Sequence, residues 1–116
     1  MMRYKFIHID IYKAELFLCE GDPEKVQKYI TERTGIKDKL KFGEEEAVTY
    51  TCGGYAVCYF NKKCTIPLLA HELLHVVIYI LSRAGISLSN DSDEAYTYLL
   101  EFLMKKALET EYTKYK

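Results

Sequence analysis

Apolar and polar residues alternate along residues 4–12, and this period of two predicts a β-strand there. A short apolar segment at 16–18 is expected to continue in an extended conformation. Asp22 and Pro23 then offer an N-cap and a first helical residue, which predicts a helix that ends at Gly35. The apolar stripe of this helix consists of Val26, Tyr29 and Ile30.

Two further strand-like segments, 47–52 and 55–60, flank Gly53-Gly54, which is the signal of a two-residue β-hairpin. The expected register places Cys52 opposite Tyr55 and Cys58 opposite Thr49. The two cysteines of the hairpin would then not face each other.

Residues 68–81 carry apolar side chains on nearly every side of a helix, which is typical of a central, buried helix. Thr65 is its expected N-cap, Pro67 lies in its first turn, and Gly85 is expected to end it. A last helix is expected after the polar run at 89–92. The apolar residues that recur along it at helical spacing are Ala95, Tyr98, Leu99, Phe102, Leu103 and Ala107.

The run His71-Glu72-Leu73-Leu74-His75 lies inside the predicted buried helix and is the most specific feature of the chain. Histidines four positions apart lie on the same side of a helix, so both imidazoles can bind one zinc ion (Zn²⁺). Glu72 lies beside them, where it can accept a proton from a water at the metal. The alternative is a chance match in a core helix. Polar groups in an apolar helix are costly unless paired or metal-bound, which favours the metal site.

A catalytic zinc needs a third protein ligand, and Glu94 is the expected one. The residues between His75 and Glu94 allow the first helix to end, the chain to turn and an antiparallel helix to begin. The alternative role of Glu94 is helix capping, because Asp91 and Glu94 have the spacing of a capping box. Asp91 and Asp93 are the expected carboxylates to orient an imidazole N–H, with capping again as the alternative.

With the motif and the later glutamate, the chain resembles the gluzincin metallopeptidases, which carry His-Glu-x-x-His on one helix and a glutamate ligand on the next. It is most similar to small metallopeptidase-like proteins of phages and prophages, and more loosely to the ImmA/IrrE type. Residues 69–75 and 93–100 carry the resemblance. One departure is Tyr98, because thermolysin-like members have an aspartate four positions after the glutamate ligand.

The resemblance implies a minimal zincin-like fold of the α+β class, in which a small antiparallel or mixed sheet with a hairpin packs on the motif helix and a glutamate-bearing helix follows. It implies a zinc metallopeptidase with a peptide or protein substrate, a phage or prophage function, and Glu72 as catalytic base. Tyr98 and Tyr79 are candidate donors to the oxyanion, with packing as their alternative.

Zincins commonly have a strand before the motif helix that forms the sheet edge above the site. Residues 55–60 are therefore the expected edge, and an ordinary packed strand is the alternative. The alternative function for the whole chain is a catalytically inactive, zincin-like binding module with structural zinc.

Composition agrees with one domain over residues 1–116, because a chain of 116 residues supports one core. The net charge of -1 gives no support for nucleic acid as a partner. No membrane span is expected, because His71, Glu72 and His75 interrupt the longest apolar run. A cytoplasmic location is expected, because the N-terminal residues lack signal-peptide character and the four cysteines agree with a reducing compartment.

Overall fold

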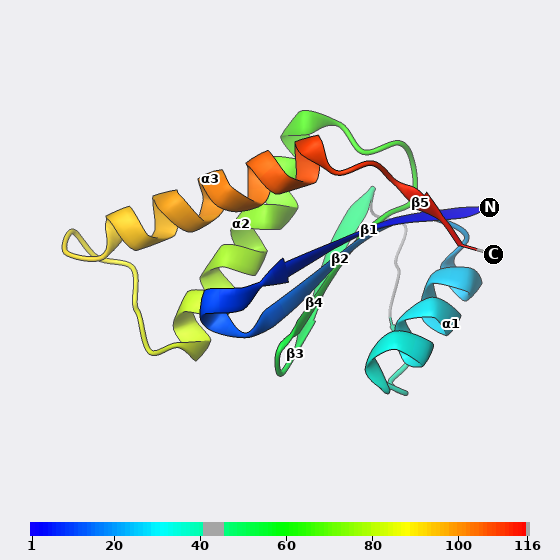
Figure 1. The fold of residues 1–116 in the computed structure, drawn as a ribbon, viewed down its shortest axis with the longest axis horizontal. Coiled ribbons are helices and arrows are strands. Elements are labelled where there is room, and N and C mark those ends of the chain that lie inside the picture. The colour runs from blue at the N-terminus through cyan, green and yellow to red at the C-terminus, as the bar shows by residue number, and fades with distance from the viewer. Residues whose placement is uncertain (41–45, 116) are drawn as a thin grey trace.

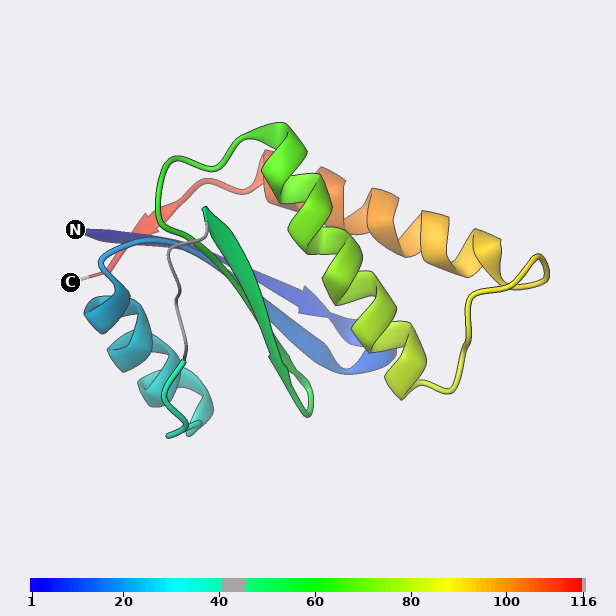
Figure 2. The ribbon, with the colours of Figure 1, turned by 180° about the vertical axis from the view of Figure 1, so that it is seen from behind.

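The computed structural model describes residues 1–40 and 46–115, which form a five-stranded mixed sheet with helices on both faces (Figures 1 and 2). The strands are β1 (Met2–Ile9), β2 (Ala14–Gly21), β3 (Ala47–Cys52), β4 (Tyr55–Phe60) and β5 (Thr113–Lys114). The helices are η1 (Asp10–Tyr12, 3-10), α1 (Pro23–Thr34), α2 (Ile66–Arg83) and α3 (Asp93–Glu109). The predicted α+β class and mixed sheet are confirmed.

The sheet has the strand order β3-β4-β2-β1-β5. β2 and β4 pair in parallel, and the other neighbouring strands are antiparallel. The first strand is shorter than its alternating pattern, because the chain turns through η1 and a left-handed Lys13 to start β2 at Ala14. β2 in turn extends well beyond the apolar segment at 16–18.

α1 has the predicted limits. The Asp22 carboxylate accepts a hydrogen bond from the Glu24 N–H, and Gly35 ends the helix with a positive φ of 77°. Val26, Tyr29 and Ile30 are buried against one face of the sheet, where they meet Phe17, Val57 and Tyr59. α2 and α3 cover the opposite face (Figure 2).

The predicted hairpin register is confirmed, with Cys52 opposite Tyr55 and Thr49 opposite Cys58. The expectation that residues 55–60 form the sheet edge is wrong. β4 lies between β3 and β2, and five of its six residues are buried, whereas every residue of β3 is half-buried. The nearly continuous apolar character of β4 is that of an interior strand paired in parallel. The edge strand beside α2 is therefore β3, and the opposite edge strand is β5.

α2 packs on β3, β4 and α3 with a buried apolar face of Leu69, Leu73, Val76, Val77, Ile80 and Leu81. The Thr65 hydroxyl caps its first turn by accepting from the Leu68 N–H. By length and composition alone α2 could cross a membrane, but the core helix of a soluble protein meets the same criterion. The globular arrangement around α2 is consistent with a soluble protein.

The start of α3 differs from the expected capping box. The cap residue is Ser92, and its hydroxyl accepts from the Ser89 N–H rather than capping the helix. Tyr96, Leu99, Leu103 and Ala107 form the buried face of α3. Tyr98 and Phe102 were expected in the same stripe, but they are exposed.

Leu73 and Leu74 provide a matched test of this packing, because they are neighbours on α2 with 0% and 44% exposure. We expect Leu73→Ala to lower the free energy of unfolding by about 2–5 kcal/mol, since it leaves a cavity in the core. Leu74→Ala should cost less than about 1 kcal/mol. Urea denaturation of both variants checks this, and equal losses would contradict the orientation of α2.

Candidate metal centre

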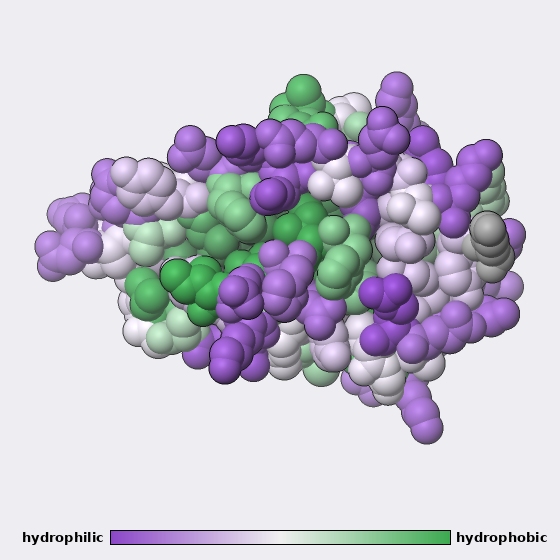
Figure 3. Space-filling model, viewed as in Figure 1, coloured by the Kyte–Doolittle hydropathy of each residue, from purple (hydrophilic) through white to green (hydrophobic). Residues whose placement is uncertain are grey.

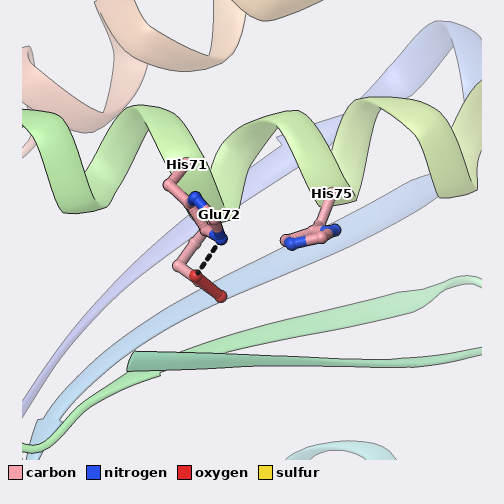
Figure 4. A group of neighbouring side chains, drawn as sticks. All are labelled: His71, Glu72 and His75. Carbon is pink, nitrogen blue, oxygen red and sulfur yellow. Dashed lines mark ion pairs between the residues drawn. The ribbon is translucent and has the colours of Figure 1, made fainter. Parts of the chain in front are cut away.

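Two imidazoles and one carboxylate come together on α2. The possible ligand atoms of His71, Glu72 and His75 all lie within 4.8 Å of one another, and the two imidazole ring centroids are 5.0 Å apart. One helical turn separates the two histidines, so their side chains share one side of α2. Figure 4 shows all three side chains pointing toward the β3–β4 hairpin, on the side of α2 opposite to α3. The sequence prediction that the motif brings these three residues together is confirmed.

The three residues differ strongly in exposure. The Glu72 side chain is 5% exposed, whereas that of His71 is 67% exposed and His75 is also exposed. One residue step rotates the side-chain direction by about 100° around a helix. Glu72 is therefore packed against β3, while the histidines lie on the solvent-exposed part of the same side of α2. The imidazoles are therefore accessible to an ion from solvent, and the carboxylate beside them is shielded.

Thr49 of β3 holds the buried carboxylate. Its hydroxyl lies 2.8 Å from Glu72 Oε1, to which it donates, and 3.4 Å from the Glu72 carbonyl oxygen. The second carboxylate oxygen, Oε2, lies 3.7 Å from His71 Nε2. One oxygen of Glu72 is thus fixed to the sheet and the other is turned toward the imidazole pair.

Sequence reasoning missed Thr49 as a site residue. The hairpin register already paired Thr49 with Cys58, and strand alternation puts Thr49 and Thr51 on one face. The missing information was which face of β3 meets α2. The signal available in the sequence was a hydroxyl donor on a predicted strand, Thr49, together with a carboxylate in an apolar helix, Glu72, which needs such a donor.

A cleft of about 330 Å³ separates β3 from the exposed side of α2. Its walls are formed by Ala47, Val48, Thr49, Thr51, His71, Glu72, His75 and Tyr79. Tyr79 lies one turn beyond His75, and its hydroxyl donates to the Gly53 carbonyl at 2.8 Å. This bond ties the hairpin turn to α2 at one end of the cleft.

Of the two candidate oxyanion donors, only Tyr79 lines this cleft. Tyr98 is 66% exposed on α3 and lines a different hollow with Tyr12, Leu99 and Phe102. Apolar side chains gather on that face of the molecule, between α3 and the end of β1 (Figure 3). Tyr98 therefore has no part in the group around Glu72.

The structure does not bring Glu94 together with the two histidines. Glu94 is an exposed residue in the first turn of α3, outside the group of ligand atoms formed by His71, Glu72 and His75. α3 begins beyond the C-terminal end of α2, whereas His71 lies in the second turn of α2 (Figure 2). Asp91 and Asp93 are exposed near the same end of α3 and also lie outside this group.

The chemistry of the group fits a divalent cation such as zinc. Zinc bonds of about 2.1 Å place tetrahedral ligands about 3.4 Å apart, so the ligand atoms, which lie within 4.8 Å of one another, would have to move closer together by side-chain rotation. His71 and His75 offer neutral nitrogen donors, and Glu72 offers negative charge beside them. Among the described residues that line the cleft, none is a lysine or arginine that would repel a cation.

Comparisons with protein families, with curated proteins and with solved structures found no match to this chain.

The Thr49–Glu72 bond can be tested by Thr49→Val, which keeps the shape of the side chain and removes the hydroxyl. We expect this substitution to lower the free energy of unfolding by about 1–3 kcal/mol, because a buried carboxylate oxygen loses its hydrogen-bond donor. Thr51→Val on the same face of β3 is the control, since Thr51 lines the cleft without contacting Glu72 through a described hydrogen bond. Equal effects of the two substitutions in urea denaturation would argue against this bond.

We also expect the protein to bind close to one zinc per chain. His71→Ala and His75→Ala should each abolish stoichiometric binding and the gain in melting temperature that zinc confers, since metal binding stabilises the folded state. Glu94→Gln should leave zinc affinity unchanged, because its carboxylate lies outside the group. Elemental analysis and zinc titration measure both quantities.

Two results would contradict this assignment. Full zinc retention in both histidine variants would show that zinc does not bind at His71 and His75. A tenfold or larger loss of zinc affinity in Glu94→Gln would return Glu94 to the ligand set.

Proposed function

We propose that the protein is a zinc-dependent metallopeptidase that cleaves a peptide or protein in the cytoplasm. The observation that carries this proposal is the state of Glu72. Its carboxylate is buried and held by Thr49, while its second oxygen faces two exposed imidazoles at an open cleft. The four cysteines are free thiols, as is usual in a reducing compartment.

In this proposal each residue of the group has a separate task. His71 and His75 would hold the metal through their imidazole nitrogens. With Glu72 as base and Glu94 outside the group, these two are the protein ligands that the described residues supply, and the other coordination positions would be open to water and substrate. When bound, zinc supplies a Lewis acid that polarises the scissile carbonyl and lowers the pKa of water. Glu72 accepts the proton of the attacking water through Oε2 and delivers it to the leaving nitrogen. Thr49 keeps the carboxylate in the orientation that this transfer needs.

The position of β3 supports a peptide as substrate. β3 is an edge strand of the sheet, and its residues line the cleft opposite His71 and His75. An edge strand presents main-chain N–H and C=O groups to which an extended peptide can add as a further strand. A peptide bound in this way would run past Glu72 with its carbonyl groups beside the imidazoles.

A second candidate is a zinc-stabilised binding module without catalysis. The observation in its favour is that a carboxylate oxygen of Glu72 lies within 4.8 Å of a ring nitrogen of both histidines, while Glu94 does not join them. If Glu72 binds the metal directly, the site has three ligands and no base. The two candidates differ in what Glu72 does, and one substitution separates them.

Glu72→Gln keeps the size of the side chain and removes its basicity. For the metallopeptidase we expect this variant to retain one zinc per chain and to lose about 10²–10⁴-fold in cleavage rate. Cleavage of a peptide library is measured by mass spectrometry, with chelator-treated wild type as the background. Glu101→Gln, at an exposed position of α3 outside the cleft, is the matched control and should keep wild-type activity.

Loss of zinc from Glu72→Gln would identify Glu72 as a ligand and favour the binding module. Chelator-sensitive cleavage that survives unchanged in Glu72→Gln would contradict its role as base.

A further inference from the structure

A second hollow of about 610 Å³ adjoins the cleft at the start of β3. Its walls are Glu46, Ala47, Pro67, Leu68, His71 and Glu72. Ala47, His71 and Glu72 line both hollows, so the imidazole of His71 and the carboxylate of Glu72 lie where the two meet. A chain laid along β3 would place side chains on both sides of this junction.

The second hollow combines an apolar wall with a carboxylate. Pro67 and Leu68, from the first turn of α2, provide the apolar surface. Glu46 is exposed just before β3, and its main-chain oxygen accepts from the Asn61 N–H, which fixes its backbone beside the end of β4. Lysine and arginine have an aliphatic stem and a charged head, and such side chains pack the stem on apolar surface while the head stays near water.

The charge of the two hollows also favours a lysine or arginine side chain. A bound zinc ion would offset the negative charge of Glu72, so Glu46 is the carboxylate that gives the second hollow its charge. No lysine or arginine is among the described residues that line either hollow. Glu46 forms no ion pair with any residue in the described part of the chain. A carboxylate without a cationic partner at an open hollow attracts a positively charged side chain.

We propose that Glu46 is a specificity-determining residue that selects peptides with a lysine or arginine close to the scissile bond. This inference rests on the proposed metallopeptidase function and names its substrate class. Glu46 precedes Thr49 by three residues, which corresponds to about 10 Å along an extended strand. The basic residue should therefore lie within about three positions of the bond that Glu72 acts on.

Cleavage of matched peptides tests the selection. One set carries a single lysine at successive positions around the cleaved bond, and the other carries uncharged norleucine at the same positions. We expect wild type to prefer the best lysine peptide about fivefold in kcat/KM, mainly through KM, as for a solvent-accessible ion pair. The ratio should approach one in Glu46→Gln, reverse in Glu46→Lys, stay at the wild-type value in Glu101→Gln, and fall as salt is raised.

Binding measured without turnover keeps the inference separate from the proposed function. Fluorescent lysine and norleucine peptides are titrated against the zinc-loaded Glu72→Gln protein, with and without Glu46→Gln. We expect the same fivefold preference, and its loss when Glu46 is replaced. A preference in binding without any Glu72-dependent cleavage would support the role of Glu46 and reject the metallopeptidase.

Cleavage or binding that does not distinguish lysine from norleucine would overturn the inference and leave the metallopeptidase standing wherever cleavage depends on Glu72. A lysine preference that survives Glu46→Gln would overturn it as well. Absence of peptide binding to the zinc-loaded protein would overturn the inference by itself.

Discussion

The hydrogen bond from the Thr49 hydroxyl to the Glu72 carboxylate joins the edge of the sheet to the central helix. A carboxylate on an apolar helix loses its hydration when the helix is buried, and it needs a donor in exchange. Because the donor is on a strand, β3 has to run along α2 at hydrogen-bonding distance from Glu72. The outward direction of His71 and His75 and the cleft between the two elements follow from that placement.

A second bond fixes the same pair of elements further along. Tyr79 donates to the Gly53 carbonyl at the turn of the hairpin, about two helical turns beyond Glu72. Two attachment points prevent β3 from rotating about either one, so the cleft has a defined width along this part of α2. The proposed function requires such a fixed geometry, since small displacements of a catalytic base reduce the rate strongly.

Local signals predicted much of this fold. The Asp22-Pro23 start and Gly35 end of α1, the Thr65 cap of α2 and the Gly53-Gly54 hairpin depend on neighbouring residues only, and the structure has each of them. The His71, Glu72 and His75 group follows from helical periodicity in the same way.

The features that sequence reasoning missed depend on contacts between distant segments. β4 was expected at the edge because it precedes the motif helix in the chain. Strand periodicity does not determine the order of strands in a sheet, so it could not show that β4 is an interior strand. Thr49 was overlooked because strand alternation gives two faces without saying which one meets a helix. Glu94 was expected beside the histidines on spacing alone, but α2 continues for two turns beyond His75 and carries the chain away from them before α3 begins.

The parallel pairing of β2 with β4 has a consequence for how the site forms. It joins residues about 40 positions apart, from Glu15 with Tyr55 to Glu20 with Phe60. Closing a loop of that length costs chain entropy before any contact compensates, so pairing of this kind forms late in folding. β3 is attached to the sheet through β4, and Glu72 is hydrogen-bonded to Thr49 of β3. His71 and His75 can approach each other in an isolated helix. Glu72 can accept its hydrogen bond from Thr49 only when the chain has closed that long loop. In the proposed function, a nascent chain would therefore bind metal at the two histidines before Glu72 is placed to act on a substrate.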